Sequence, residues 1–402
     1  MVAALTHSFG PAHLALAEEV VQEALIEALR RWPFHGTPQN PAAWLFSVAR
    51  NRALDRLRRD TTFRDKEPEI RRALMAQVPE PGETYFPGEI SDDQLRLIFL
   101  CCHPDLSRNG RVALTLKTVL GFSVGEISRA FLARESTIAQ RLVRAQRRIR
   151  ERRIPLEVPG PGELTERLEG VLEVLYLVFN EGYSRHQGGD LVRADLCSEA
   201  LRLTVHLAGL PLTQRPAVHA LAALLCFQAS RLSARVDATG NLVPLADQDR
   251  TLWDWEMIRG AFHHLECASD GDRLTTYHVE AAIAAQHAGA SKVGHTDWAG
   301  ILDLYDQLIT LNPSPVVALN RAVAVARVHG AAAGLAALEE LGEPAPLKEY
   351  HLLPATRAAL LVQAGRPEEA AGWFQRALAC PCSEPERRYL MKRLAAARCA
   401  HG

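Results

Sequence analysis

The chain has 402 residues, of which 48% are hydrophobic and 6% aromatic. This length and apolar content suffice for two or three domains with buried cores, which excludes a disordered tail and a small scaffold stapled by disulfides. The formal net charge of −1 hides a division at Arg153: 24 basic and 18 acidic side chains up to that residue give +6, and the 22 basic and 29 acidic side chains after it give −7. A basic first part joined to an acidic second part makes nucleic-acid binding by the first part a hypothesis to test.

Eight cysteines in 402 residues are too few for a disulfide framework. The sequence shows no cationic-then-apolar leader at Met1 and, on inspection, no apolar run of about 18 residues. We therefore expect a cytosolic, reduced protein with no membrane segment. Few stretches alternate between apolar and polar residues, whereas apolar residues recur at helical spacing, so the predicted fold class is all-α.

The first predicted domain covers residues 1–60 and contains two helices. The helix over 17–31 has apolar residues at the spacing of one buried face, and the helix that begins near Pro41 carries proline where a first turn tolerates it. A polar stretch with several prolines and glycines then predicts a linker over 61–91, with one short helix near 70–76. The apolar residues assigned to the buried face of the first helix are Val20, Val21, Ala24, Leu25, Ala28 and Leu29.

The second predicted domain, residues 92–154, contains two helices followed by a helix-turn-helix. Ser123 is expected to cap the first helix of that motif, with Glu126 completing a capping box. The second helix begins at Ser136, and in this motif the first turns of the second helix enter the major groove of DNA. The residues expected to form the angle between these helices are Ile127, Phe131, Ile138 and Leu142, and the two preceding helices are expected over 94–102 and 111–120.

The second helix of this motif is strongly basic, because residues 134–153 hold eight arginines and two glutamates. Gln140 and Arg141 are suited to bidentate contacts with base edges, whereas three further arginines are suited to phosphates. The alternative is a solvated basic helix that binds nothing. The turn, the capping box and the row of arginines together favour DNA binding. The three arginines assigned to phosphates are Arg144, Arg147 and Arg148.

A second basic helix covers residues 49–59 and neighbours a proline-rich stretch that contains Trp32, Phe34 and Trp44. The arginines supply cations for phosphates, and the aromatic rings supply flat surfaces on which an unpaired base can stack. Trp44 at helical spacing is equally suited to a hydrophobic core. From the residues alone, capture of a DNA base and core packing therefore remain alternatives.

Three segments of the first part resemble bacterial RNA polymerase sigma factors of the extracytoplasmic-function class, within the sigma-70 family. Residues 17–24 are similar to the region 2 helix that docks on the clamp helices of the polymerase β′ subunit, and residues 40–59 are similar to the region that melts and reads the minus-ten promoter element. The motif that begins at Phe122 resembles region 4, which reads the minus-thirty-five element and contacts the β flap. Further segments, 97–104, 179–183, 191–196 and 314–324, resemble the subgroup with a long C-terminal TPR-like extension.

The resemblance implies core RNA polymerase and promoter DNA as partners, and a place in the bacterial cytoplasm at the nucleoid. Helical residues that usually precede the segment 2–5 are absent and Leu16 stands where an acidic residue is usual, so we expect a short first helix or a start codon assigned too far downstream. The implied polymerase-binding residues are Glu18, Glu19, Gln22 and Glu23; the minus-ten residues are Trp44, Arg50, Asn51, Arg52, Arg56, Arg58 and Arg59; the minus-thirty-five residues are Arg134, Ser136, Thr137, Gln140, Arg141, Arg144, Arg147 and Arg148.

The remainder of the chain, residues 163–402, is predicted to be a TPR-like helical array. Two segments, 298–305 and 365–378, have the spacing of the first helix of such a repeat, whereas 163–289 lacks a clear period. Arrays of this kind bind proteins or peptides on a concave surface, so we predict a regulatory module with such a partner. The alternative is a solvated acidic solenoid without an electrostatic role. Helix breaks are expected near Gly182, Gly209, Gly240, Gly271, Gly289, Pro313, Gly342 and Gly365.

Several polar residues near the start of this extension are candidates for a regulatory junction, although such residues are more often caps and buried pairs. The sequence contains no HExxH motif, nucleophile elbow or glycine-rich phosphate loop. We therefore predict no catalytic residue, cofactor or metal. The junction candidates are Asn180, Glu181, Tyr183, Arg193 and Asp195; the weak zinc pattern set aside is Cys380, Cys382, Cys399 and His401; Cys101, Cys102 and His103 are assigned to core packing.

The predicted function is that of a sigma factor that binds core RNA polymerase, directs promoter-specific initiation and is controlled by its helical extension. The alternative is a helix-turn-helix regulator that binds DNA without polymerase and senses a ligand or peptide through its helical domain. A third hypothesis is a scaffold in which the TPR-like array is the main active part, and it predicts that partner binding survives deletion of the residues up to Arg153.

Overall fold

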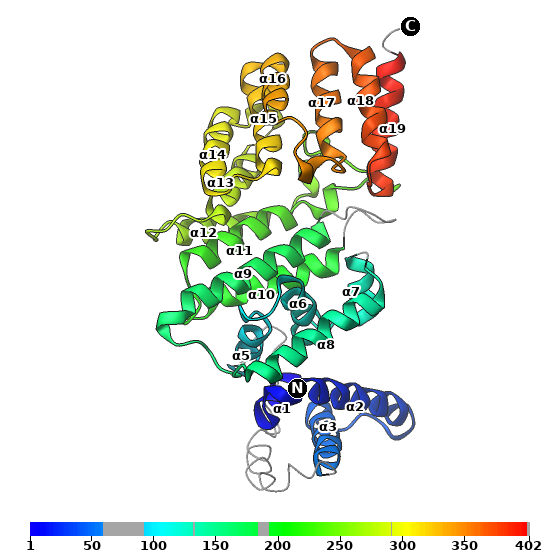
Figure 1. Ribbon diagram of the computed structural model, residues 1–402, viewed down its shortest axis with the longest axis vertical. Helices are drawn as coiled ribbons and strands as arrows, with labels where there is room; N and C mark the ends of the chain where they lie inside the picture. Colours follow the sequence, from blue (N-terminus) through cyan, green and yellow to red (C-terminus); the bar gives the residue numbers. More distant parts are fainter. Residues whose placement is uncertain (59–91, 132, 184–192, 291, 400–402) are drawn as a thin grey trace. The chain divides into compact units, whose positions relative to one another are not determined.

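The computed structural model describes residues 1–58, 92–131, 133–183, 193–290 and 292–399 (Figure 1). Within these residues the chain is helical, and its extended pairing is limited to one isolated bridge between Val236 and Leu242. The all-α prediction is therefore confirmed. The predicted linker over 61–91, its short helix near 70–76 and Arg59 lie outside the described residues.

The chain divides into two compact units, Met1–Leu177 and Val178–Gly402. The boundary falls inside helix α9 (Pro161–Tyr183), whereas the sequence suggests a boundary at the proline- and glycine-rich cluster just before this helix. The finer division into two sigma domains, a linker and an extension remains a prediction. Besides α9, the helices of the first unit are α1 (Val2–Phe9), η1 (Pro11–His13), α2 (Leu14–His35), α3 (Pro41–Arg58), α5 (Asp92–Cys101), α6 (Arg108–Leu114), η3 (Thr115–Val119), α7 (Val124–Ala130) and α8 (Glu135–Arg152).

Helices α2 and α3 pack on each other through small and aliphatic side chains. Ala24 of α2 and Ala49 and Ala53 of α3 are fully buried in one shared core. Because alanine adds little bulk, it allows the two helix backbones to approach closely. Helix α2 runs further than the sequence predicts, to His35, and Gly36 ends it with a φ of 78° that favours glycine.

A second helical group in the first unit begins at α5. Ser107 starts α6 by accepting a hydrogen bond from the backbone N–H of Gly110, at 3.2 Å. The segment expected as one helix over 111–120 instead widens after α6 into the π-helical turn η3. The predicted capping box at α7 is confirmed: the N–H of Glu126 donates to Ser123 Oγ at 3.2 Å, and the N–H of Ser123 donates to Glu126 Oε2 at 2.8 Å.

In the second unit, successive helices pack on one another, and Figure 1 shows α17, α18 and α19 side by side. Helices end at or near most of the glycine and proline positions predicted as breaks, whereas Gly240 lies within the long connection between α11 and α12. Gly330, with a φ of 88° between α15 and α16, is a further break that the sequence analysis missed. The helices are α10 (Ala194–Gly209), α11 (Pro216–Ala229), α12 (Trp255–Ala268), α13 (Thr276–Gly289), α14 (Trp298–Leu311), α15 (Pro315–His329), α16 (Ala331–Leu341), α17 (Leu352–Gln363), α18 (Pro367–Ala379) and α19 (Glu384–Cys399), with short 3-10 turns between some of them.

Helix α11 contradicts one expectation from the sequence. The segment 216–234 is long and apolar enough to cross a membrane by those two criteria alone, so a run of this kind does exist. Of this segment, 67% is buried within the protein. A helix that is apolar on all sides and covered by its neighbours, such as α12 and α13, is also what a domain core requires.

Candidate nucleic-acid interface

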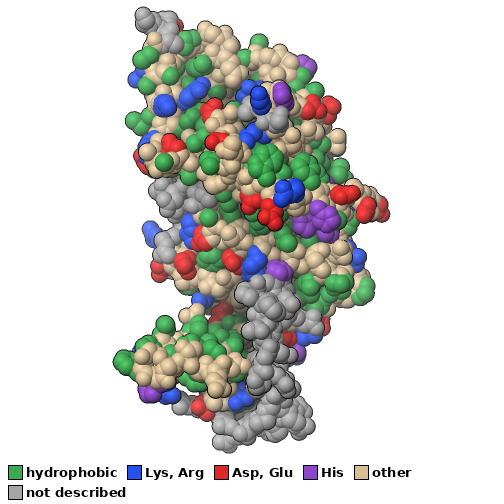
Figure 2. Space-filling view, turned by 180° about the vertical axis from the view of Figure 1, so that it is seen from behind, with side chains coloured by type: hydrophobic (Ala, Val, Ile, Leu, Met, Phe, Trp, Pro, Cys, Tyr) green, Lys and Arg blue, Asp and Glu red, His purple; other side chains and the backbone are tan. Residues whose placement is uncertain are grey.

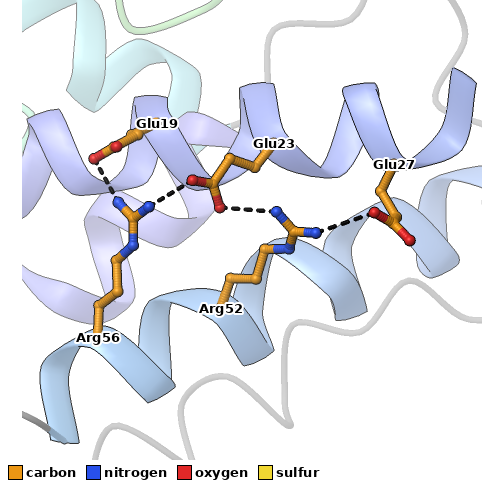
Figure 3. A network of polar contacts seen from close by, with 5 residues as sticks. All are labelled: Glu19, Glu23, Glu27, Arg52 and Arg56. Atoms are coloured by element: carbon orange, nitrogen blue, oxygen red, sulfur yellow. Dashed lines mark hydrogen bonds and ion pairs between the residues drawn. The ribbon is translucent and has the colours of Figure 1, made fainter. Parts of the chain in front are cut away.

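A network of ion pairs connects α2 to α3 (Figure 3). The guanidinium group of Arg52 lies 2.9 Å from the carboxylate of Glu23 and 3.2 Å from that of Glu27. The guanidinium group of Arg56 lies 2.5 Å from the carboxylates of Glu19 and Glu23. Hydrogen bonding to Glu19 is the main cause that raises the pKa of Arg56. Two arginines predicted to contact DNA are thus paired with two glutamates predicted to contact polymerase.

The other two predicted polymerase contacts have different surroundings. Gln22 is exposed on α2. The carboxylate of Glu18 accepts hydrogen bonds from Thr118 Oγ1 and, at 3.3 Å, from Gln146 Nε2. Burial is the main cause that raises the pKa of Glu18, and these two hydrogen bonds and the charge of Lys117 oppose it. Glu18 is therefore held against the second helical group of the same unit.

An apolar stripe on α2, formed by Leu25, Ile26 and Leu29, is exposed to solvent. The side chains of Leu25 and Leu29 are 42% and 77% exposed, so their assignment to the buried face was wrong. Val20, Val21, Ala24 and Ala28 alone fill that face. Figure 2 shows apolar side chains at the surface of the lobe that contains α2 and α3. An unpartnered row of large aliphatic side chains indicates a surface for protein binding.

One signal in the sequence points to this second stripe. Helix α2 carries more apolar residues than a single core-facing stripe of about 100° can hold. The smaller residues, mainly Ala and Val, face α3, and the larger Leu25, Ile26 and Leu29 face solvent. Sorting the apolar residues by size as well as by spacing identifies the surface that spacing alone hides.

The predicted minus-ten residues lie along α3 with unequal access to solvent. Asn51 is exposed and Arg50 is half-buried. Trp44 is half-buried, and its ring meets that of Trp32 edge-on with centroids 5.6 Å apart. Contact with Trp32 on one side leaves part of the Trp44 surface accessible, so base capture by Trp44 stays a prediction. Arg58 is in the last turn of α3, and its side chain and Arg59 are outside what the structure describes.

Helix α8 separates an apolar face from a basic one. It begins at Glu135, one residue before the predicted start. Of the four residues expected at the angle between α7 and α8, three are buried and one is half-buried. The buried residues are Ile127, Ile138 and Leu142, and the half-buried one is Phe131. Of the predicted minus-thirty-five residues, Arg134, Ser136, Gln140, Arg144 and Arg147 are exposed, and Thr137, Arg141 and Arg148 are half-buried.

Most of these α8 side chains are available for contact with a polyanion. Within α8, the guanidinium group of Arg147 forms an ion pair with the carboxylate of Glu151, one helical turn further along, at 2.5 Å. This hydrogen bond lowers the pKa of Glu151 and raises that of Arg147. Because both side chains are exposed, a phosphate can compete with Glu151 for the guanidinium group. The basic face of α8 therefore has the charge and access that DNA binding needs.

Helix α9 contacts the second helical group through residues that the sequence analysis did not select. Glu173 pairs with Arg108 at 2.8 Å and with Arg111 at 3.4 Å, and Arg167 donates a hydrogen bond to the carbonyl of Phe99 at 3.0 Å. A cavity of about 360 Å³ lies beside these contacts, with Cys102 and Gly170 in its lining. No local motif marks these pairs, because their partners are 62 to 68 residues apart along the chain.

The predicted junction residues surround the connection from α9 to α10, within the second unit. The ring of Tyr183 is stacked on that of Phe179 with centroids 5.7 Å apart, and the guanidinium carbon of Arg235 lies 3.7 Å from its centroid. Arg193 pairs with Asp195 at 2.6 Å and lowers the pKa of that carboxyl. Ring contacts and a local ion pair of this kind are what the alternative to a regulatory site, caps and buried pairs, predicts. Asn180 and Glu181 are half-buried, and residues 184–192 lie outside the description.

The cysteines give no support for a metal centre. Cys101 and Cys102 are buried, as the sequence predicts, and burial raises the pKa of both thiols. Across the residues with described positions, no group of three or more His, Cys, Asp or Glu side chains is placed to hold a metal ion. His401, one of the zinc ligand types considered, lies outside those residues.

Two family models match the chain. Residues 1–62 match sigma-70 region 2, which covers α1, α2 and α3. Residues 167–269 match a family of unknown function, DUF6596, and this match begins in the α9 segment that contacts α5 and α6. No solved structure matches the chain significantly.

Curated proteins that are similar to the chain include one from Rhizobium meliloti and one from Mycobacterium tuberculosis. The uncharacterized protein R00370 of Rhizobium meliloti is 43% identical over 383 residues, which cover 95% of this chain and 90% of that protein. The ECF RNA polymerase sigma factor SigL of Mycobacterium tuberculosis is 32% identical over 139 residues, which cover 34% of this chain and 73% of SigL. The first likeness spans both units, and the second spans most of a sigma factor. The chain therefore belongs to the sigma-70 family of RNA polymerase sigma factors.

Proposed function

We propose that this chain is a sigma factor of the extracytoplasmic-function class that binds core RNA polymerase and directs promoter-specific initiation. Region 2, residues 1–60, reads the minus-ten element, and region 4, residues 92–154, reads the minus-thirty-five element through the α7–α8 helix-turn-helix. A TPR-like extension modulates this activity. The protein acts by binding in the cytoplasm and catalyses no bond change.

One observation carries this proposal: a single compact unit has both the exposed apolar stripe of α2 and the basic face of α8. The stripe supplies a surface for a protein partner in the part matched to sigma-70 region 2. The basic face supplies a surface for DNA in the part that resembles region 4. Because the stripe lies in the part matched to sigma-70 region 2, its occurrence together with the basic face favours a sigma factor.

The apolar stripe revises which residues we propose for polymerase docking. Glu19 and Glu23 are engaged with Arg52 and Arg56, so they position α2 on α3 as much as they offer charge to a partner. Gln22 lies one helical turn before Leu25 and Ile26 and shares their face. We propose that Gln22 and the stripe make the main contact with the clamp helices of β′.

The same network separates the residues of α3 that are proposed to contact minus-ten DNA from those that are proposed to hold α3 on α2. Asn51 and Arg50, together with the accessible part of Trp44, are proposed to meet the strand directly. Arg52 and Arg56 are proposed to hold the α2–α3 pair in shape, because each is already bound to two carboxylates. Arg56 and its partners are partly exposed to solvent, so replacement of Arg56 is expected to loosen the position of α3 on α2 with little effect on the stability of the fold.

The contacts of α9 supply a route by which the extension affects region 4. Glu173 and Arg167, which belong to the predicted extension, bind Arg108, Arg111 and the carbonyl of Phe99 in α5 and α6. A partner that moves α9 therefore changes the support of the helices that precede α7. We propose a protein or peptide as that partner, bound by the helical array that follows.

Run-off transcription with core polymerase tests the proposed function. We expect the full chain to give transcripts from a cognate promoter that core polymerase alone does not give. A truncation after Leu177 keeps the first compact unit and the α9 contacts, so a change in transcript yield measures the effect of the extension. Operator binding without polymerase association would instead support the polymerase-independent regulator.

A pair of substitutions on α8 tests the sorting of DNA contacts. Replacing Arg141 with alanine is expected to change the preference among minus-thirty-five sequences, because a bidentate base contact contributes about 1–3 kcal/mol of discrimination. Replacing Arg148 with alanine is expected to weaken binding equally across sequences and to lessen its salt dependence by about one phosphate contact. Holoenzyme binding to promoter variants over a range of salt measures both. The same sequence-independent loss in the two variants would contradict the assignment.

A further inference from the structure

The cavity beside α9 lies within the first unit, against α6 and the end of α5, and has the size of a small-molecule site. Its volume is about 360 Å³, and ligand pockets usually have volumes of about 300–1,000 Å³. Its wall carries charges of both signs from two helices, α6 and α9. The charged lining residues are Arg111, Glu166, Arg167, Glu169 and Glu173.

The guanidinium group of Arg111 is mostly buried, yet its hydrogen-bonding capacity is little used. The side chain is 17% exposed, and its ion pair with Glu173 is 3.4 Å long, beyond the range of about 2.7–2.9 Å that charge-assisted hydrogen bonds usually have. Arg108, at 2.8 Å, is the closer cation to Glu173. Among the residues that the structure describes, Arg111 Nε is buried and has no hydrogen-bond partner. Arg111 therefore has donor capacity left for a ligand with oxygen acceptors.

Arg167 on α9 is the second cation of the cavity wall, and it is also only partly used. Its Nη2 donates to the carbonyl oxygen of Phe99 at 3.0 Å, whereas Nε is buried and has no partner in the described part of the chain. Burial is the main cause that lowers the pKa of Arg167, and the charge of Glu163 opposes it most. Two guanidinium groups from different helices are suited to a carboxylate, which accepts hydrogen bonds from both.

Helix α9 supplies both space and the opposite charge. Glu166, Gly170 and Glu173 are spaced at four and three residues, so they share one face of the helix. At Gly170 an added Cβ would lie 3.2 Å from Arg111 Nη1 and 3.3 Å from the carbonyl oxygen of Cys102, so the guanidinium group lies directly against this face. Glu166 is exposed, and its backbone lies about 6 Å before Gly170 along the helix axis. A ligand with an anion and a cation can therefore meet opposite partners about one helical turn apart.

The balance of charge around the cavity favours such a ligand over a simple anion. The lining holds two arginines and three glutamates, so a phosphate dianion attracted by the arginines is repelled by the glutamates. We propose that the cavity binds a small zwitterion, an amino acid or a close analogue, with its carboxylate on Arg111 and Arg167 and its ammonium group on Glu166. The bound molecule holds α9 against α5 and α6 and so fixes the support of the helices that precede α7.

Isothermal titration calorimetry of the full chain tests the site without polymerase. The probes are the standard L-amino acids and γ-aminobutyrate, each titrated separately, and acetate and methylammonium, which carry one of the two charges each. We expect at least one zwitterion to bind, and acetate and methylammonium to bind at least about tenfold more weakly, because each lacks one charged contact. Absence of binding by every zwitterion would overturn the site, and so would acetate binding as tightly as the best zwitterion.

Substitutions in the cavity wall locate the bound zwitterion. Glu166→Gln removes the charge of an exposed side chain and is expected to weaken zwitterion binding at least about tenfold. Arg111→Lys keeps the positive charge but loses the planar fork of donors, so it is also expected to weaken binding. Glu163→Gln, three residues before Glu166 on α9 and outside the lining, is the matched control and is expected to bind like the wild type. Unchanged affinity in the Glu166→Gln chain would contradict the assignment.

The effect of the ligand on transcription rests on the proposed function, and run-off transcription separates the two. The zwitterion that binds is expected to change the transcript yield of the wild-type chain and to have a smaller effect on that of the Glu166→Gln chain. Binding by calorimetry together with no transcript from any chain would overturn the proposed function and would support the site. Transcripts whose yield does not respond to the bound zwitterion would overturn its effect on the helices that precede α7.

Discussion

Replacing Leu29 with glutamate is expected to weaken binding to core RNA polymerase at least tenfold while leaving the fold intact. The side chain is 77% exposed in the free protein, so it loses little packing when replaced. At an interface, loss of a buried leucine costs about 2 kcal/mol, and an unpaired carboxylate adds to that cost. Because about 1.4 kcal/mol changes an affinity tenfold, a loss of ten- to hundredfold follows. Titration of labelled core polymerase measures it.

Two substitutions, one at the same position and one at the position before it, serve as controls for Leu29→Glu. Leu29→Met keeps the apolar volume and is expected to bind polymerase within about threefold of the wild type. Ala28→Glu, one position earlier, places a carboxylate at a side chain that is 3% exposed and is expected to unfold the α2–α3 pair. Wild-type affinity in the Leu29→Glu variant would show that polymerase does not use the apolar stripe.

Replacing Gly182 with alanine is expected to destabilise the second unit by about 1–3 kcal/mol, even though alanine favours helix by about 1 kcal/mol. An added Cβ would lie 2.8 Å from the carbonyl oxygen of Arg193 and from Cβ of Leu196, and 2.9 Å from Sγ of Cys197. The carbonyl of Gly182 also accepts a hydrogen bond from the N–H of Arg193 at 2.7 Å. The free-energy cost of these close contacts is expected to exceed the gain from the helix propensity of alanine, because one of the contacting atoms belongs to the backbone and cannot move aside. Chemical denaturation followed by circular dichroism measures the loss.

Gly372→Ala is the matched control for Gly182→Ala. Gly372 lies in the middle of α18, and an added Cβ there meets nothing within 4 Å. This variant is expected to gain up to about 1 kcal/mol from the same helix preference. If the Gly182→Ala chain were as stable as the Gly372→Ala chain, the close approach of α10 to the end of α9 would be contradicted. The pair also tests why a glycine stands between two of the predicted junction residues, Glu181 and Tyr183.

Local patterns predicted much of the secondary structure correctly. The capping box joins Ser123 to Glu126, three residues away, so its geometry depends on one turn of chain. Most helix breaks were found for the same reason, since glycine and proline act on their own backbone. Two local predictions were wrong. The segment expected to be one regular α-helix over 111–120 contains the π-helical turn η3, and Gly330 separates α15 from α16, where no break was predicted.

The candidate surfaces were predicted only in part. The basic face of α8 follows from arginines spaced at three and four residues, and the structure leaves most of them exposed. Of the four residues predicted to bind polymerase, Glu19 and Glu23 form ion pairs with α3. Their partners lie 29 to 37 positions further along, and no spacing rule connects residues across a turn between helices.

The sequence by itself determined the helical fold, the division of charge at Arg153 and the resemblance to sigma factors, because each depends on composition or on neighbours within a few turns. Only the tertiary structure decided which apolar side of α2 faces α3, and which glutamates are already bound. The physical reason is that helical periodicity groups residues by direction but does not say which direction the partner occupies. Leu29 and Ala28 are adjacent and both apolar, yet one is exposed and the other buried, because α3 packs on one side of α2.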